Sequence, residues 1–291
     1  MPDYSYSILE SRGVLLISGA DKSDFLQGLI SNDVHRVNAN KAIYAALLTP
    51  QGKYLFDFFI VEHNGILLLE TERNRMSDLI KRLSMYKLRA EVDLQDISQK
   101  WRVIAVWGNG AFNAFSLPSR EGAAVPCNNG ICFVDPRLTN AGARVLLPKD
   151  DPLPAKGALP IEFYDIHRLD LGLPEGSRDL MLEKAILLEN GFDELNGIDW
   201  KKGCFIGQEL TARTKYRGLV KKRLIPVRVN GKLPEPGSKI FAENKLVGEI
   251  RSGRNQQALA LVRLDTINDK NKILRSGAAT IVPVKPKWAN F

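Results

Sequence analysis

Apolar residues recur in short runs along the chain, and their spacing predicts both strands and helices. Short apolar or alternating segments bounded by glycine, proline or asparagine are typical of strands, whereas apolar positions three and four apart are typical of helices. We expect strands at residues 13–18, 43–49, 53–62, 66–70, 101–107 and 143–147. We expect helices after Asp21, at residues 74–88 and at residues 161–171, where Gly172 and Pro174 end the pattern.

Two turns follow from local chemistry. Asn64-Gly65 predicts a tight hairpin turn, and the Pro and Gly of residues 49–52 predict a second turn between two strands. Asp21 and Ser23 are candidate N-caps for the first helix. The stretch between residues 107 and 143 is rich in Gly, Asn and Pro, and we interpret it as surface.

The pattern changes after Arg223. Short alternating strands are expected at residues 224–229, 239–242, 245–252, 258–263 and 279–284. Repeated short strands at this spacing are typical of a small antiparallel barrel. The fold class is therefore α+β, with a body at residues 1–222, open to division into two subdomains, and a β-barrel domain at residues 223–291.

Composition describes a soluble globular protein, with 44% hydrophobic and 25% charged residues. The net charge of +8 favours anionic partners such as nucleic acid, phosphate or polycarboxylate. Three cysteines form no disulfide framework, and Cys127 and Cys132 lack the further ligands of a zinc site, so we expect no metal site. No 18-residue apolar run and no targeting pattern occur, which predicts a cytosolic protein with no membrane contact.

The segment at residues 201–213, KKGCFIGQELTAR, sets one thiol among lysines and glycines. Nearby ammonium groups favour a thiolate, so Cys204 is a candidate for a reactive or ligating sulfur. Most free cysteines are instead small buried hydrophobic residues, and the residues alone leave both interpretations open.

Asp57 lies within a strand that is apolar on both faces. A carboxylate there needs a partner or a polar cavity, because its burial without one costs several kcal/mol. A structural salt bridge and a functional role are both consistent with this position.

Three segments together resemble a known family. They are KGCFIGQE followed by TAR, GLPEGSRDL at residues 172–180, and an N-terminal block from Gly19 through Asn32-Asp33-Val34. They resemble the YgfZ-type folate-binding proteins, which are paralogues of the glycine cleavage T-protein (GcvT, aminomethyltransferase) and act in iron–sulfur cluster assembly or repair. The resemblance spans most of residues 8–225 and is greatest to the branch with the mitochondrial assembly factor for [4Fe–4S] proteins. It implies a GcvT/YgfZ-like fold and a tetrahydrofolate cofactor, and we expect a bacterial, cytoplasmic source.

The resemblance also implies site residues. Gly52 to Asp57 matches the spacing that leads to the catalytic aspartate of the T-protein, and Cys204 is the functional thiol. Asp170 stands where the T-protein has its pteridine-binding glutamate, and Tyr164 where YgfZ proteins have an aromatic residue. A second expected aromatic is replaced by Arg12. The predicted cofactor-binding set is Tyr164, Arg168, Asp170, Lys202, Gly203, Gln208, Glu209 and Arg213.

Each assignment has an alternative. Arg168 and Asp170 are also consistent with an exposed helix ion pair. The basic run at residues 213–223 is either a solvated face or a site for an anion such as a folate glutamate tail, RNA or an acidic protein. The alternative functions are a folate-dependent one-carbon transferase that uses Asp57, so the question of an enzyme stays open, and an RNA-associated factor linked to tRNA modification. We expect a monomer that binds folate and iron–sulfur client or carrier proteins, with nucleic acid not favoured.

Overall fold

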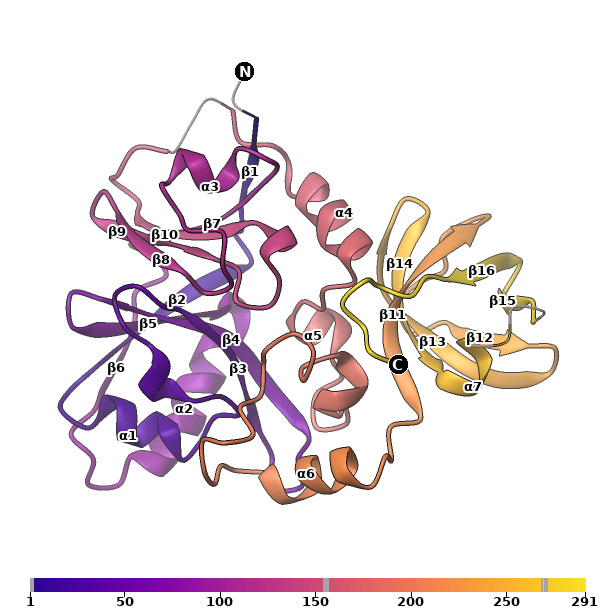
Figure 1. The fold of residues 1–291 in the computed structure, drawn as a ribbon, viewed down its shortest axis with the longest axis horizontal. Coiled ribbons are helices and arrows are strands. Elements are labelled where there is room, and N and C mark those ends of the chain that lie inside the picture. Colours follow the sequence, from indigo (N-terminus) through magenta and orange to yellow (C-terminus); the bar gives the residue numbers. More distant parts are fainter. Residues whose placement is uncertain (1–2, 154–156, 268, 270–271) are drawn as a thin grey trace. The chain divides into compact units, whose positions relative to one another are not determined.

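The computed structural model describes residues 3–153, 157–267, 269 and 272–291. The chain forms two compact units, and the helices and strands of both are labelled in Figure 1. The body unit comprises Met1–Leu48, Leu55–Tyr164 and Leu195–Ile206. The barrel unit comprises Thr49–Tyr54, Asp165–Glu194 and Gly207–Phe291. The barrel strands begin at Lys222, beside the expected boundary, but the barrel unit also contains segments that precede the barrel in the sequence.

The first sheet of the body unit has the order β3-β4-β5-β2-β6. Its strands are β2 (Arg12–Ser18), β3 (Ile43–Leu48), β4 (Tyr54–His63), β5 (Ile66–Glu72) and β6 (Asp93–Asp96). The predicted hairpin is confirmed, because His63 pairs with Ile66 and both turn residues between them have positive φ. The turn between β3 and β4 is confirmed by the hydrogen bond from Gly52 N–H to the Thr49 carbonyl, 2.9 Å long.

Helices α1 (Lys22–Gln27) and α2 (Met76–Lys87) supply apolar side chains to the core of this sheet. The 3₁₀ helices η1 (Val34–Arg36) and η2 (Arg73–Arg75) lie beside them in the chain. Asp21 does occupy the N-cap position of α1, but its side chain accepts from Glu91 N–H rather than from the helix. The capping role predicted for Asp21 is therefore wrong, because a neighbouring loop takes its carboxylate.

The second sheet of the body unit has the order β1-β7-β10-β9-β8. Its strands are β1 (Ser5–Ile8), β7 (Trp101–Trp107), β8 (Ala124–Cys127), β9 (Gly130–Val134) and β10 (Ala143–Pro148), with α3 (Ala111–Ala114) and η3 (Thr139–Ala141) between them. Strands β7 and β10 confirm the prediction. The intervening stretch is not all surface, however, because β9 is buried along its whole length. The apolar run at residues 131–134 carried a strand signal, but the glycine, asparagine and proline residues around it obscured the strand.

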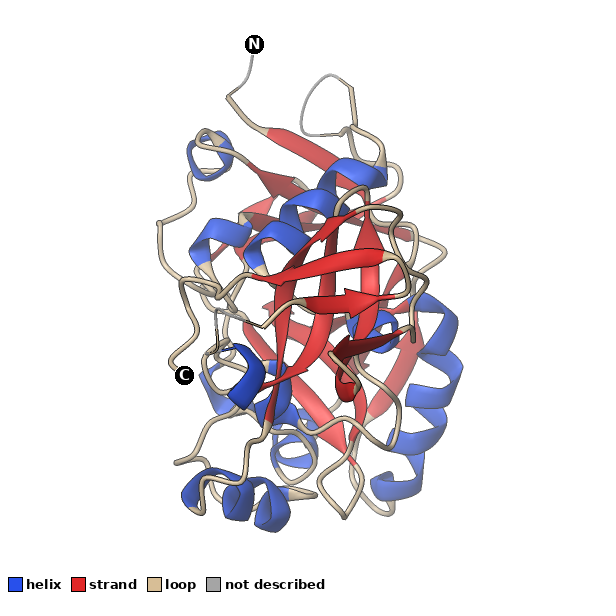
Figure 2. Cartoon of the chain, turned by 90° about the vertical axis from the view of Figure 1, so that its right-hand side faces the viewer, coloured by secondary structure: helices blue, strands red, loops and turns tan. Residues whose placement is uncertain are grey.

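The barrel unit contains a closed antiparallel barrel in the order β11-β14-β13-β12-β15-β16. Its strands, drawn in red in Figure 2, are β11 (Lys222–Asn230), β12 (Lys239–Ala242), β13 (Lys245–Arg254), β14 (Gln257–Arg263), β15 (Leu274–Ser276) and β16 (Ala279–Pro283). Pairing of β11 with β16 closes it around an apolar core. The α+β fold class with a C-terminal barrel is confirmed; only the three-residue β15 escaped the alternation pattern.

Short helices complete the chain: α5 (Gly176–Asp179), η4 (Leu187–Asn190), α6 (Gln208–Tyr216) and α7 (Leu264–Ile267). Helix α4 (Ile161–Leu171) runs from the body unit into the barrel unit. It ends as predicted at Gly172, whose φ of +76° is left-handed. A side chain at this glycine would also meet the ring of Pro226 at 2.9 Å. Both the left-handed backbone and the lack of space therefore favour glycine here.

Candidate functional site

A layer of buried charged residues lies between the two sheets of the body unit. It pairs three guanidinium groups with the carboxylates of Glu70 and Asp135, and it also contains Asp57 and several aromatic rings. The first sheet supplies Arg12, Tyr44, Asp57, Phe59 and Glu70, and the second sheet with its flanking segments supplies Phe133, Asp135, Arg137, Arg144 and Tyr164; all ten are buried. Buried charges cost free energy unless they are paired, so the partners of each group decide what this layer does.

Glu70 links the two sheets through arginines. Arg12 Nε donates to its Oε1 at 2.6 Å from the next strand, and Arg144 Nη1 from the other sheet lies 3.5 Å from the same oxygen. The second carboxylate oxygen, Oε2, is buried and has no hydrogen-bond partner among the described residues, and the same is true of Arg144 Nη1. An acceptor and a donor are therefore left unmatched in one buried place, where a water molecule or a polar group of a ligand would satisfy them.

Asp57 faces this layer and is not exposed to solvent. The hydroxyl of Tyr44 donates to its Oδ2 at 2.9 Å, and its main-chain carbonyl accepts from Thr71. Burial, and then the neighbouring carboxylate, raise the pKa of Tyr44 well above its ordinary value. Tyr44 thus stays protonated and acts as a hydrogen-bond donor to Asp57. The sequence left a salt bridge and a functional role open for Asp57, and one partner of its carboxylate is the phenol of Tyr44.

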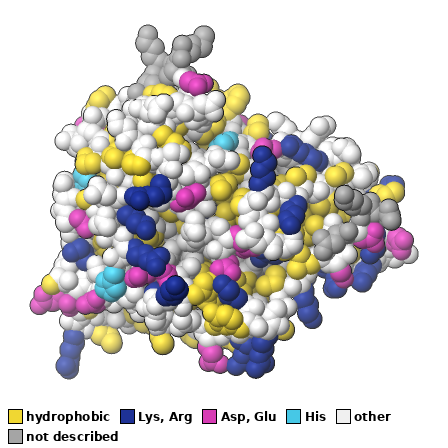
Figure 3. Space-filling view, in the orientation of Figure 1, with side chains coloured by type: hydrophobic (Ala, Val, Ile, Leu, Met, Phe, Trp, Pro, Cys, Tyr) yellow, Lys and Arg dark blue, Asp and Glu magenta, His cyan; other side chains and the backbone are white. Residues whose placement is uncertain are grey.

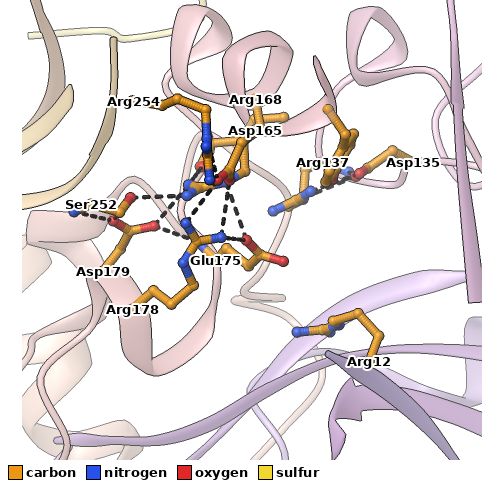
Figure 4. A network of polar contacts seen from close by, with 12 residues as sticks. Arg12, Asp135, Arg137, Asp165, Arg168, Glu175, Arg178, Asp179, Ser252 and Arg254 are labelled. Carbon is orange, nitrogen blue, oxygen red and sulfur yellow. Dashed lines mark hydrogen bonds and ion pairs between the residues drawn. The ribbon is translucent and has the colours of Figure 1, made fainter. Parts of the chain in front are cut away.

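Asp135 and Arg137 form a second buried pair, in which Arg137 Nη2 lies 2.8 Å from Asp135 Oδ2 (Figure 4). Burial alone would raise the pKa of Asp135, but the Arg137 charge and its hydrogen bonds outweigh that effect and lower it. The Arg137 guanidinium also lies 5.0 Å from the ring centre of Phe59. The pair is ionised and aromatic rings surround it, which suits recognition of a flat polar ring.

The sequence pattern did not single out Glu70, Asp135, Arg137 or Arg144. Two of them carried the same signal as Asp57, because each is a charged residue inside an otherwise apolar strand: Glu70 follows Ile66–Leu69 and Arg144 precedes Val145–Leu147. Arg12, which the sequence marked only as a missing aromatic, is the ion-pair partner of Glu70.

Tyr164 lies in this layer and belongs to the part of α4 in the body unit. Its hydroxyl accepts from Arg144 Nη2 at 2.6 Å, and its ring centre is 5.8 Å from that of Trp107. Tyr164 is thus buried and held on two sides. The aromatic residue expected at this position therefore lies among the charged groups of the layer.

Arg168, four residues later, belongs to the barrel unit and is the centre of a different cluster (Figure 4). It contacts Asp165 at 2.7 Å, Asp179 at 2.9 Å and Glu175 at 3.2 Å, and it donates to Ser252 of strand β13. Arg178 and Arg254 complete the cluster by pairing with Asp165. The guanidinium is fully buried, so the exposed ion pair that the sequence allowed for Arg168 is wrong. Arg168 joins α4 and α5 to strand β13 of the barrel.

Asp170 lies at the surface of the barrel unit. Its side chain is 56% exposed and pairs with Arg228 of strand β11 at 2.8 Å. The alternative of an exposed ion pair is therefore correct for Asp170, although its partner is on a strand and not on the helix. A pteridine-binding carboxylate was expected in a concave, buried place, and this position is neither.

Cys204 is exposed on the loop that precedes α6, whereas Cys132 is buried. The neighbouring Lys202 fixes this loop: its Nζ donates to the main-chain carbonyls of Gln27 and Ile30, 2.5 Å away in both cases, at the end of α1. Gly203 has a φ of +94°, which only glycine adopts without strain. The interpretation of Cys204 as a small buried hydrophobic residue is thus wrong, because a loop anchored by Lys202 presents the thiol to solvent.

Lys202 itself is partly buried. Burial lowers the pKa of Lys202 to about 8, although Asp33 and Asp199 favour its charged form. Its ammonium also lies 5.2 Å from the ring centre of Phe205. Lys202 therefore binds main-chain carbonyls of the body unit and positions the residues around Cys204.

The remaining motif residues lie on α6, in the barrel unit. Gln208 begins this helix after the left-handed Gly207, and Glu209 pairs with Arg213 one turn later at 2.8 Å. Both side chains of that pair are largely exposed. The motif therefore spans two units: Cys204 belongs to the body unit, and Gln208, Glu209 and Arg213 belong to the barrel unit.

Internal ion pairs neutralise much of the basic run at residues 213–223. Besides Arg213, Lys215 pairs with Asp193 at 3.0 Å and Arg223 pairs with Glu194. On the face drawn in Figure 3, Lys and Arg side chains lie in several places. Ion pairs within the barrel unit thus take up three of the six cations of the run, which reduces the charge it offers to RNA.

Two further features concern only the described residues. Within them, no three His, Cys, Asp or Glu side chains form a group that can hold a metal ion. The helices that the structure describes include none with the length and apolarity needed to cross a membrane.

Comparison with known proteins places the chain in a family. Residues 9–116 match the GCVT N-terminal domain, and residues 221–291 match the CAF17 C-terminal β-barrel domain. The crystal structure of glycine cleavage system aminomethyltransferase T from Bartonella henselae superposes with a TM-score of 0.77, covering 99% of this chain and 86% of that one. At 13% identity this similarity shows the fold alone.

The sequence relatives are closer. The human protein named iron–sulfur cluster assembly factor IBA57, mitochondrial, is 34% identical over 96% of this chain and 84% of its own length. The mouse protein of that name is 32% identical with the same coverage. The Neurospora crassa homologue is 30% identical over 91% of this chain, which spans 64% of that longer protein. The expected bacterial cytoplasmic origin is overturned by these relatives, because they are mitochondrial proteins of eukaryotes.

Proposed function

Since the chain belongs to the IBA57 family of iron–sulfur cluster assembly factors, we propose that it supports [4Fe–4S] cluster assembly in mitochondria and uses Cys204 as its working thiol. The observation that carries this proposal is the exposure of Cys204 on a loop anchored by Lys202. A thiol that only filled space would be buried, as Cys132 is. An exposed thiol on a fixed loop is available to a cluster or to a partner protein, and the cluster is then cargo handed to a client or carrier protein.

We further propose that the buried charged layer of the body unit recognises tetrahydrofolate. The pteridine ring carries an amino group and a ring N–H that donate together to one carboxylate, and a carbonyl that accepts. Glu70 Oε2 and Arg144 Nη1 are an unmatched buried acceptor and donor, and the rings of Phe59 and Tyr164 lie beside the Arg144 guanidinium, at 4.9 and 5.3 Å. The chemistry of these residues fits the ring. When bound, tetrahydrofolate supplies a carrier for one-carbon groups.

Asp57 has a supporting role in this proposal. Its carboxylate accepts from Tyr44 and its carbonyl accepts from Thr71, so it holds neighbouring side chains of β3 and β5 in place. These contacts make Asp57 a positioning residue of the layer and do not single out one-carbon transfer.

Complementation tests the proposal. Human or yeast cells depleted of their own IBA57 protein would receive the wild-type chain with a mitochondrial targeting sequence, Cys204→Ala, or the control Cys127→Ala, whose cysteine lies on strand β8. The readout is the activity of mitochondrial [4Fe–4S] enzymes at matched protein levels. We expect activity with wild type and Cys127→Ala but not with Cys204→Ala. Full activity with Cys204→Ala would refute a working role for this thiol.

A further inference from the structure

The C-terminal end of α2 in the body unit presents two aliphatic side chains to solvent. Leu88, directly after the last helical residue, is 91% exposed, and Met85 in the last turn is 63% exposed. No other large apolar side chain among the described residues is as exposed as Leu88. Single exposed leucines are common on proteins, so the backbone and the charges around this one decide whether it has a role.

The backbone at Leu88 is unfavourable for leucine. Its φ of +46° and ψ of −106° lie outside the regions that residues with a Cβ atom usually adopt. Glycine adopts a positive φ without this cost, and an exposed leucine gains no stability from burial in the core. Neither backbone preference nor packing within the chain therefore accounts for a leucine at this position.

The turn that carries Leu88 is held on both sides. Before it, Leu83 of α2 is buried in the core of the first sheet. After it, Glu91 N–H donates to Asp21 Oδ2 at 2.8 Å, and Val92 is buried in the same core. The exposed side chain therefore projects from an ordered turn, so binding through it costs little further ordering of the backbone.

Unpaired positive charge accompanies the two aliphatic side chains. Residues 79–90 include four cations and no carboxylate; the cations are Lys81, Arg82, Lys87 and Arg89. None of them forms an ion pair or a side-chain hydrogen bond within the part of the chain that the structure describes. The helix dipole favours a cation in the last turn, which accounts for Lys87 but not for the other three.

The shape and composition of this end favour a lipid surface over an acidic protein. Protein interfaces are depleted in lysine and enriched in aromatic side chains. Here half of the cations are lysines, and Tyr86, the one aromatic residue of residues 79–90, packs against the core. Projecting aliphatic side chains flanked by cations match the boundary between anionic head groups and acyl chains.

We propose that the C-terminal end of α2 is a contact for an anionic phospholipid surface. Leu88 and Met85 enter the boundary between head groups and acyl chains, and the four cations contact the phosphates. The expectation of no membrane contact rested on apolar runs and targeting patterns, and a surface contact by one helix end produces neither. The contact does not depend on the roles proposed for Cys204 or for the buried charged layer.

Vesicle co-sedimentation of the full chain tests the proposal. The probes are vesicles of phosphatidylcholine, vesicles of phosphatidylcholine and the anionic lipid cardiolipin at four to one, and soluble polyglutamate, whose binding calorimetry measures. We expect at least about tenfold tighter binding to the mixed vesicles than to the neutral ones, and a loss at high salt, because the cations contact phosphates. Polyglutamate supplies charge without an apolar layer and should bind more weakly than the mixed vesicles.

Variants locate the contact. Leu88→Gly removes the side chain and suits the backbone, so it should weaken binding to the mixed vesicles by about tenfold without lowering the melting temperature. Lys81→Gln combined with Arg89→Gln should weaken it by a similar factor. Leu246→Ala, which removes an exposed leucine of strand β13 in the barrel unit, should leave binding unchanged. The proposal is overturned if mixed and neutral vesicles bind alike, if polyglutamate binds as tightly as the mixed vesicles, or if Leu88→Gly binds like wild type.

Discussion

Tyr44 donates a hydrogen bond to the buried carboxylate of Asp57 across two neighbouring strands of one sheet, with an oxygen–oxygen distance of 2.9 Å. Both side chains are almost completely buried. Burial limits the access of water to both groups, so the loss of one partner is not easily compensated. The contact therefore stabilises β3 against β4 where the charged layer begins.

Tyr44→Phe should lower the free energy of unfolding by about 1–3 kcal/mol, because it removes a hydrogen bond to a buried carboxylate. Denaturant unfolding of Tyr44→Phe, Asp57→Asn and the double variant measures the coupling. The folded pKa of Tyr44 lies above its unfolded value near 10, so its contribution is complete below pH 10 and falls as the pH rises further. The loss of stability above pH 10 should thus be smaller in Tyr44→Phe. Additive effects of the two single substitutions would contradict the contact.

Arg168→Met should cost about 3–5 kcal/mol, the range for breaking a buried ion pair from one side, since Asp165 and Asp179 lose their shared partner. Arg213→Gln is the control, because it breaks only the exposed pair with Glu209 and should cost less than about 1 kcal/mol. Thermal and urea unfolding measure both. Equal effects of the two substitutions would show that burial of Arg168 does not matter.

The same cluster predicts acid sensitivity. Burial opposes ionisation of Asp165, but Arg178 and Arg168 hold its pKa below its ordinary value. A lowered folded pKa gives stability that is present above the unfolded pKa near 3.9 and is lost as the pH falls below it. Asp165→Asn should therefore be less stable than wild type at pH 7, and the difference should shrink below pH 4. A difference that stays constant from pH 7 to pH 2.5 would count against this cluster.

Lys202→Met should loosen the Cys204 loop by leaving the carbonyls of Gln27 and Ile30 without their ammonium donor. The folded pKa of Lys202, about 8, lies below its unfolded value of 10.5. Between these values the unfolded chain holds a proton that the folded chain has released, so the contribution of Lys202 to stability rises with pH. Wild type should show this rise between pH 8 and 10.5, Lys201→Met should keep it, and Lys202→Met should lack it. Hydrogen exchange of residues 201–206 reports the loosening directly.

Glu70 and Asp170 are the two candidates for the carboxylate that recognises the pteridine ring. Glu70→Gln should weaken tetrahydrofolate binding by about 1–3 kcal/mol, because the ring's paired donors lose an ionised acceptor. Asp170→Asn, at an exposed ion pair, should leave binding unchanged. Calorimetry measures both after circular dichroism confirms folding, and Arg12→Lys, which keeps a cation beside Glu70, separates loss of the ion pair from loss of the acceptor. A strong effect of Asp170→Asn with none of Glu70→Gln would return the carboxylate role to Asp170.

The sequence by itself determined the local features of this protein. Alternation predicted the barrel strands, Asn64-Gly65 the hairpin and Gly172 the end of α4, because each depends on neighbours a few residues away. The spacing of KGCFIGQE identified the loop and its thiol. An aspartate inside an apolar strand marked Asp57 as a residue in need of a partner.

Only the tertiary structure decided which partner each charged residue has. Arg12 and Glu70 are 58 positions apart, and strand pairing brings them together. Tyr164, Arg168 and Asp170 lie within seven residues, yet one joins the layer between the sheets, one centres a buried cluster and one is exposed. Helical periodicity says which residues share a face but not what covers that face. The burial of a charge, and hence its chemistry, is a property of the packed chain.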